Sequence, residues 1–480
     1  MAFLIGGANS AADTGFSVDN SCRFDGSTAY MSKTMGTATN RLKLTMSVWL
    51  KRSTLGASVF FSSYYSASYR FQFYFDGSDR LAVLNVDSGS TNVSLITNRV
   101  FRDVSAYYHV QVVIDTTEAS SSNRVKLYVN GTQETSFATS TYPAENADMS
   151  LGASSYTANI GRYGGDSDYF SGYMAEFVYL DGQTLAPTSC GEFDEDSPTI
   201  WKPIDVSELT FGDEGIYCDF EDSDNLGDDE SGNTSDLAET NLAATDQASD
   251  SPTNNFCVMN SLTASSYSTL SEGNTKTAGN SSSDNGNVVA TIVPSSGKWY
   301  CECKIGNKQG TGYPSIGMAQ EDDPNFGTVL NSTVGTAGYN GTSSGIYRPD
   351  GQKYSNNSTA AFGSGNSFDT DDIMMMAMDC DNGAFYIGKN GSWISDGTNT
   401  GDPASAGSKT GAFLTWTPAD ETGQTFATRD YDDSVLLWNF GNPTYANSSD
   451  AADANGYGAF EYAPPSGYFA LCTKNLAEYG

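Results

Sequence analysis

Apolar and polar residues alternate strictly in several short stretches of the chain, which is the pattern of β-strands. The clearest stretch, residues 41–51, reads RLKLTMSVWLK, with its Leu, Met and Val side chains on one face and Lys, Thr, Ser and Trp on the other. A period of two residues places successive side chains on opposite faces of a sheet. We therefore expect a strand here that is covered on its apolar face only.

The same alternation recurs on both sides of a long polar stretch and predicts further strands. In the first half they fall at residues 70–77, 109–115, 124–131 and 170–182, and in the second half at residues 297–305, 371–379, 384–389, 411–416 and 435–440. Two phrases, residues 112–133 and residues 376–393, have a strand, a polar turn, a second strand and Asn-Gly in the same order. Each phrase predicts an antiparallel hairpin.

Length and turn composition favour two domains built from many short strands. The chain has 480 residues and 49 glycines, and no stretch keeps a helical period for long. The predicted fold class is all-β, with two antiparallel jelly-roll β-sandwich domains in tandem. The predicted boundaries are an N-terminal arm at 1–20, a first sandwich at 21–212, an acidic connector at 213–255 and a second sandwich at 256–480.

The charge balance excludes several classes of partner. With 58 acidic and 24 basic residues the formal charge is −34, which opposes binding to nucleic acid and to anionic membrane surfaces. No run approaches the roughly 20 apolar residues of a membrane span, so membrane insertion is not expected. The opening MAFLIGGANSAADTG has a short apolar core and no basic flank, so we predict no signal peptide.

The eight cysteines are scattered along the sequence and contain no CxxC pair. Cys301 and Cys303 fall on one face of a single strand, where they are badly placed to bond each other. Reduced, buried thiols are therefore expected, rather than a disulfide framework or a zinc site.

Several motifs resemble known modules. NIGRY (159–163) followed by FSGYMAEFVYLDGQTL (170–185) resembles the laminin-G/concanavalin A-like jelly roll, over about residues 22–200. GKWYCECKI (297–305), SIGMA (315–319) and the hairpin at 371–391 resemble the B30.2/SPRY domain, over about residues 285–480. These resemblances imply two sandwiches with binding loops at their rims.

The segment at 211–233 and CRFDGSTAYMSKT (22–34) resemble virion proteins of marine tailed bacteriophages that combine these two modules. The resemblance implies a structural virion protein, assembled in the host cytoplasm and released by lysis. The function expected is a tail fibre or receptor-binding protein that attaches non-covalently to a host surface glycan or receptor. The alternative is a capsid decoration or tail structural protein that contacts other virion subunits.

The same hypothesis sets expectations for partners. The N-terminal arm is expected to dock on other virion proteins. Because each loop contact is weak, several copies would have to bind together, so a homo-oligomer such as a trimer is expected.

Aromatic side chains beside polar loop residues are the candidate ligand contacts, since aromatic faces and amide or carboxylate groups suit a sugar or receptor. In the second domain these candidates are Tyr339, Tyr347, Arg348 and Trp393, and in the first domain they are Tyr64, Tyr65 and Tyr69. The loops of SPRY-like domains form a binding face, so the candidates in the second domain are preferred.

Catalytic machinery is not predicted. The only histidine, His109, lies within a predicted strand and is read as a packing residue. Some glycosidases of the laminin-G-like fold carry Glu-x-Asp-x-x-Glu, and the nearest match has Glu192 and Asp194 but Ser197 in the third position. The missing carboxylate argues against glycoside hydrolysis.

Calcium is the only metal for which the sequence offers candidates. The acidic stretch DFEDSDNLGDDE (219–230) supplies Asp219, Asp222, Asp224 and Asp228 as possible ligands. Leu226 occupies the fifth position of an EF-hand register that begins at Asp222, which argues against that loop type. A solvated acidic linker is the alternative interpretation.

Overall fold

The computed structural model is all-β and divides into two compact units. The first sandwich comprises residues 11–253, and the second comprises residues 254–480 together with residues 1–10. The structure describes residues 15–233, 236–282, 286–310, 313–320, 344–355, 358–363, 366–405, 407–418 and 423–480, and the backbone of residues 4–5. Within these ranges, no helix has the length and apolar character needed to cross a membrane.

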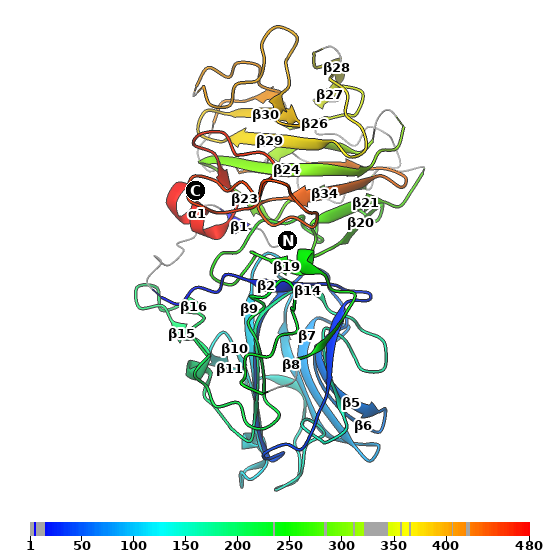
Figure 1. Cartoon of the computed structure of the whole chain (residues 1–480), viewed down its shortest axis with the longest axis vertical. Helices are drawn as coiled ribbons and strands as arrows, with labels where there is room; N and C mark the ends of the chain where they lie inside the picture. The colour runs from blue at the N-terminus through cyan, green and yellow to red at the C-terminus, as the bar shows by residue number, and fades with distance from the viewer. Residues whose placement is uncertain are drawn as a thin grey trace. The chain divides into compact units, whose positions relative to one another are not determined.

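The first sandwich contains two eight-stranded antiparallel sheets (Figure 1). One sheet has the order β11-β10-β9-β4-β14-β2-β19, with β17 beside β14. Its strands are β2 (Ser21–Asp25), β4 (Lys43–Arg52), β9 (Tyr108–Asp115), β10 (Val125–Val129), β11 (Thr132–Gln133), β14 (Ser171–Asp181), β17 (Ile216–Cys218) and β19 (Gln247–Ala248).

The other sheet has the order β12-β8-β7-β6-β5-β13-β3-β18. Its strands are β3 (Tyr30–Thr34), β5 (Ser58–Ser66), β6 (Tyr69–Phe75), β7 (Arg80–Asp87), β8 (Ser90–Val100), β12 (Phe137–Thr141), β13 (Thr157–Ile160) and β18 (Ala238–Thr240). Outside the two sheets, this unit has the 3₁₀ turns η1 (Ser121–Asn123), η2 (Pro187–Ser189) and η3 (Ala244–Asp246), and a small hairpin of β15 (Glu192–Phe193) and β16 (Trp201–Lys202).

Alternation produces the core between these sheets, as the sequence predicted. Leu44, Met46 and Val48 of β4 are buried, and Phe71 and Phe73 of β6 belong to the same apolar cluster. The predicted hairpin of residues 112–133 is confirmed, because β9 and β10 pair antiparallel with Leu127 opposite Val112.

The second face of β4 is also covered, so the expectation of one-sided cover was wrong. Ser47 and Lys51 are buried on that face, and Trp49 packs against Trp201. Residues that follow β14 form this cover, including Phe211, which packs on Val178 of β14. A strand with polar residues on one face can be buried on both sides when those residues find partners.

The stretch at 213–255 is mostly part of the first sandwich, which corrects the prediction of a connector. Residues 213–253, here called the acidic cover, contribute strands β17, β18 and β19. Phe220, Leu226 and Leu237 are buried in the main core of this unit. Three apolar side chains spaced along the acidic stretch thus pack into the core and attach the stretch to the first sandwich.

Buried ion pairs explain why the acidic cover folds onto the sheets. Lys51 Nζ lies 2.7 Å from Asp250 Oδ2 with both side chains at 1% exposure or less, and Lys33 Nζ lies 3.1 Å from Asp229 Oδ2. A buried charge is tolerated when it has a partner of opposite charge and hydrogen bonds. The acids of the cover supply those partners to lysines on β3 and β4.

The second sandwich pairs a nine-stranded sheet with a six-stranded sheet. The first has the order β20-β21-β34-β24-β29-β30-β31, with β32 beside β30 and β35 beside β24, and the second has the order β22-β33-β25-β26-β27-β28. The nine strands are β20 (Ser268–Ser271), β21 (Lys276–Gly279), β24 (Lys298–Asn307), β29 (Ile373–Asp379), β30 (Ala384–Lys389), β31 (Ser392–Trp393), β32 (Leu414–Thr415), β34 (Val435–Asn439) and β35 (Phe469–Ala470).

The six strands are β22 (Gly286–Val289), β25 (Ser315–Gln320), β26 (Gly345–Tyr347), β27 (Gln352–Ser355), β28 (Ser358–Ala361) and β33 (Gln424–Asp430). A helix, α1 (Thr473–Tyr479), ends the chain. The predicted hairpin of residues 376–393 is confirmed, with Met376 of β29 opposite Ile387 of β30. All eight cysteines are free and buried, as expected.

The predicted N-terminal arm at 1–20 is not one separate segment. Strand β1 (Leu4–Ile5) pairs in parallel with β23 (Ile292–Val293) of the second unit. Val18, by contrast, is buried in the first sandwich beside Trp49. Backbone pairing at one end and apolar packing at the other tie these residues to the two units.

Residues 441–468, here called the C-terminal cover, lie over the outer face of the nine-stranded sheet. Phe460 and Tyr468 pack there with Tyr300 of β24 and Tyr386 of β30. Glu302, fully buried on β24, accepts hydrogen bonds from the backbone N–H groups of Glu461 (2.9 Å) and Tyr462 (2.8 Å). Each sandwich thus buries the outer face of one sheet beneath a segment with little regular structure.

Candidate functional site at the β5–β6 hairpin

The most exposed large aromatic side chain among the described residues lies at the tip of the β5–β6 hairpin. Tyr65 is 62% exposed. The register explains its position, since Tyr64 pairs with Arg70 and Ser66 pairs with Tyr69, so Tyr65 is the extra residue of a β-bulge. A bulge re-aims a side chain at the end of a ladder.

On one side of the hairpin, three tyrosine rings form a continuous surface. The Tyr65 ring stacks on that of Tyr156 with centroids 5.3 Å apart and an interplanar angle of 21°. The Tyr69 ring meets Tyr65 edge to face at 6.3 Å, and the Tyr69 hydroxyl accepts a hydrogen bond from Ser88 Oγ at 3.3 Å. Partial burial raises the pKa of Tyr156.

On the other side, Tyr64 packs edge to face with Tyr163 at 5.3 Å. Strand β13 brings these residues together, because it pairs with β5 and places Thr157 opposite Tyr64. Tyr156 immediately precedes β13, and Tyr163 follows its end by three residues. We call Tyr64, Tyr65, Tyr69, Tyr156 and Tyr163 the tyrosine cluster. Tyrosine offers a flat apolar face and a polar hydroxyl with few rotatable bonds, which suits recognition of a ligand that is itself partly apolar and partly polar.

The candidates in the second sandwich do not form such a surface. Tyr347 is fully buried in the core, and its hydroxyl donates a hydrogen bond to the backbone oxygen of Asn366. Arg348 pairs with Asp350 at 3.2 Å. Trp393 packs partly buried against the aromatic group under the C-terminal cover, and Tyr339 lies outside the described residues. The preference for this domain was therefore wrong as regards Tyr347, because its side chain belongs to the apolar core of the second sandwich.

The acidic stretch does not gather its carboxylates around one point. Asp219 Oδ1 accepts the N–H of Glu221, and Asp222 Oδ1 accepts the N–H of Asp224, both at 2.9 Å. Burial and the neighbouring acids raise the pKa of Asp228. Across the described ranges, no group of three or more His, Cys, Asp or Glu side chains is placed to hold a metal ion, so the four calcium candidates gain no support.

The sole histidine is a packing residue within a hydrogen-bond chain. Trp201 Nε1 donates to His109 Nδ1 at 3.1 Å, so the imidazole proton is on Nε2, which donates to Ser47 Oγ at 2.7 Å. Burial lowers the pKa of His109 to about 3, so the ring stays neutral. This tautomer cannot remove a proton from Ser47, which excludes a serine–histidine nucleophile here.

The carboxylates compared with a glycosidase motif are engaged by a lysine. Lys202 Nζ lies 3.3 Å from Glu192 Oε1 and 3.6 Å from Asp194 Oδ2. Asp194 Oδ1 also accepts the N–H groups of Asp196 and Ser197. One lysine thus contacts both carboxylates of the partial glycosidase motif.

Comparison with known protein families gives a match within the first sandwich. Residues 25–185 match the Concanavalin A-like lectin/glucanases superfamily. The whole tyrosine cluster lies inside the matched range. The search of the curated proteins gave no match to the chain.

Solved structures also resemble parts of the chain at low sequence identity. They include the SPRY domain of human HERC1 (16% identity, TM-score 0.27, covering 38% of this chain and 96% of that chain). A SAP-like pentraxin from Limulus polyphemus follows at 18% identity and TM-score 0.27, covering 36% and 80%. The TRIM65 PSpry domain is 12% identical with TM-score 0.25, covering 38% and 91%.

Sequence reasoning found three members of the tyrosine cluster and missed Tyr156 and Tyr163. Tyr163 is the last residue of the NIGRY motif and Tyr156 stands three residues before that motif, whose strand β13 pairs with β5. The signal available was the position of Tyr156 immediately before a short strand and of Tyr163 three residues after that strand. Sequence alone does not say which strand lies beside β13, because pairing between distant strands is set by the whole fold.

Proposed function

We propose that the chain is a non-catalytic, carbohydrate-binding protein that uses the tyrosine cluster to hold sugar rings. The observation that carries this proposal is an exposed, three-ring tyrosine surface inside the lectin/glucanase-like region. Aromatic faces pack against the apolar faces of sugar rings, while hydroxyl groups hydrogen-bond to the ring substituents. The neutral His109 and the lysine-paired Glu192 and Asp194 support a binding role over a hydrolytic one.

The biological setting we propose is the virion of a tailed bacteriophage, with this chain as a tail fibre or other host-attachment protein. The resemblance of residues 22–34 and 211–233 to such proteins supports this setting. A single small aromatic surface binds weakly, so we infer that several copies act together in a homo-oligomer.

The test is a glycan array with the full chain and the double variant Tyr65→Ala, Tyr156→Ala. We expect the wild-type chain to bind a defined set of glycans and the variant to lose at least about tenfold in affinity, since two aromatic contacts of about 1 kcal/mol each are removed. Tyr128→Ala, on β10 of the other sheet, is the matched control and should bind like the wild type. Undiminished binding by the double variant would remove the tyrosine cluster from the proposal.

A further inference from the structure

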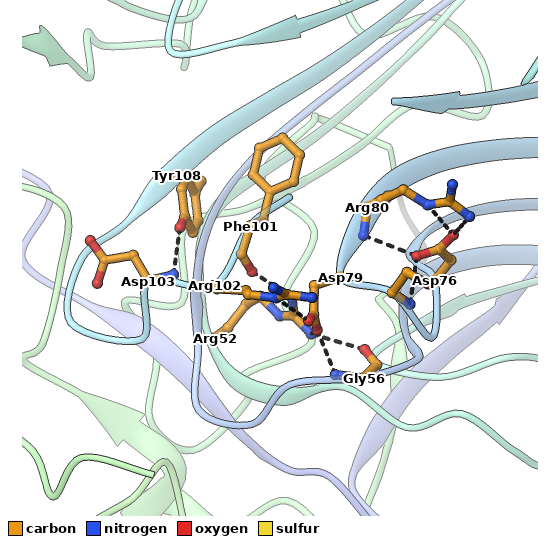
Figure 2. A network of polar contacts seen from close by, with 10 residues as sticks. Arg52, Gly56, Asp76, Asp79, Arg80, Phe101, Arg102, Asp103 and Tyr108 are labelled. Atoms are coloured by element: carbon orange, nitrogen blue, oxygen red, sulfur yellow. Dashed lines mark hydrogen bonds and ion pairs between the residues drawn. The ribbon is translucent and has the colours of Figure 1, made fainter. Parts of the chain in front are cut away.

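Arginines of this chain nearly always meet a carboxylate. In the described residues, ion pairs join an acid to Arg23, Arg41, Arg52, Arg80, Arg99, Arg102, Arg124, Arg162 and Arg348. Figure 2 shows this usual arrangement, with Arg52 and Arg102 converging on Asp79, and Arg80 on Asp76. In a chain with 58 acids and 24 bases, such pairing is the expected outcome.

Arg70 departs from this rule. It is half-buried on β6, and within the described ranges no carboxylate lies at ion-pair distance from it. Arg429 is buried, and its guanidinium carbon lies 5.1 Å from the ring centroid of Tyr313. Arg70 thus has a partly exposed charge that can meet an anion from solvent.

The position of Arg70 connects it with the tyrosine cluster. It lies directly opposite Tyr64 in the β5–β6 ladder, so the two side chains emerge on the same face. Its Nε donates to Gln72 Oε1 at 3.3 Å and its Nη1 donates to the backbone oxygen of Ala67. These contacts hold the guanidinium beside the tyrosine rings, and no described contact uses Nη2.

Arg70 places a positive charge near the Tyr163 ring. Burial raises the pKa of Tyr163, and the nearby charge of Arg70 opposes that increase. The next acid in the loop, Asp166, is paired with Arg162. The Tyr64–Tyr163 side of the cluster therefore has a cation beside it, although the chain as a whole is strongly acidic.

We propose that the Tyr64–Tyr163 side of the tyrosine cluster binds an acidic glycan, with a uronic-acid carboxylate on Arg70 and a sugar ring on the tyrosines. This inference rests on the proposed function and adds the charge of the ligand to it. A planar guanidinium matches a carboxylate with two parallel hydrogen bonds. The net charge of −34 repels an anionic glycan at long range, but screening at about 8 Å in physiological salt leaves the local cation in control of the contact.

The test measures binding of the full chain to uronic-acid oligosaccharides, each paired with its uncharged methyl ester. We expect at least one acid form to bind at least about tenfold more tightly than its ester, because a hydrogen bond to a charged group contributes that much. Arg70→Gln should abolish this preference, and Arg70→Lys should retain part of it. Arg99→Gln, which removes an arginine paired with Glu134, is the matched control and should leave the preference unchanged.

The outcomes separate the two proposals. Equal binding of acids and esters, or a preference that survives Arg70→Gln in a folded variant, overturns the assignment of an acidic ligand and leaves carbohydrate binding standing. Binding of polyglutamate as tight as that of the uronates overturns the requirement for a sugar ring. Failure to bind any glycan, acidic or neutral, overturns both the inference and the proposed function.

Discussion

In the first sandwich the rings of Tyr64 and Tyr163 meet edge to face at 5.3 Å, and in the second sandwich those of Tyr300 and Phe460 do so at 5.0 Å. The ring geometry is nearly the same, but Tyr300 and Phe460 are fully buried while the tyrosine cluster reaches solvent at Tyr65. The C-terminal cover makes the difference, since it supplies Phe460 itself. An aromatic cluster becomes a binding surface only where the chain leaves it uncovered.

The aromatic side chains beneath the C-terminal cover lie beside a buried carboxyl group that binds the cover through hydrogen bonds. Glu302 accepts two backbone N–H groups of the C-terminal cover, the Tyr300 hydroxyl at 3.0 Å and Asn439 Nδ2 at 3.4 Å. Two of these four donors belong to the cover, so the buried carboxyl ties the cover to the sheet. The comparison therefore predicts that changes in the second sandwich alter stability, and that changes in the tyrosine cluster alter binding.

The largest effect is expected from Phe460→Ala. Loss of a fully buried ring leaves a cavity and should lower the free energy of unfolding by about 3–5 kcal/mol. Chemical denaturation of the full chain measures this change. A loss below about 1 kcal/mol would mean that the C-terminal cover is not packed as described, and the contrast between the two clusters would fail.

A smaller effect is expected from pH through Glu302. Burial raises its pKa from 4.5 to about 7, so between these values the folded chain holds a proton that the unfolded chain has released. Stability should fall as pH rises from about 4.5 to about 7, by about 3 kcal/mol for this group, and should change little from it above pH 7. Asp430, whose pKa burial raises to about 6, acts in the same direction.

Glu302→Gln isolates the contribution of Glu302, because an amide stays neutral at every pH. Denaturation of wild type and variant across pH 4–8 should show a smaller decline for the variant. Parallel curves for the two proteins would contradict the role of the Glu302 carboxyl.

The sequence predicted the sheets better than their covers, for a physical reason. Alternation in β4, β6 and β24 is a local pattern set by the pleat, and it can be read from ten residues. The acidic cover depends on Asp229 meeting Lys33 and Asp250 meeting Lys51, pairs separated by 196 and 199 residues. No local sequence pattern indicates which distant lysine each of these acids meets, so the sequence of this stretch resembles that of a linker.

The tyrosine cluster was predictable only in part for the same reason. Tyr64, Tyr65 and Tyr69 share one hairpin and could be grouped from the sequence. Tyr347 looked equivalent in a loop-rich stretch, and burial by the surrounding core decided otherwise.

The smallest effect on stability is expected from Tyr65→Ala. Its side chain is mostly exposed, so the free energy of unfolding should change by no more than about 0.5 kcal/mol. Denaturation beside Phe460→Ala gives the direct contrast. A loss of several kcal/mol would place Tyr65 among the structural aromatics and weaken its assignment to binding.

The most direct test of the central claim is hydrogen-exchange mass spectrometry of the full chain with and without a glycan that it binds. Ligand contact slows exchange of the backbone amides it orders or covers. We predict slower exchange at residues 62–72 and 153–166, with no change at residues 344–355 or 386–394. Protection confined to the two second-sandwich segments would contradict the assignment of binding to the tyrosine cluster.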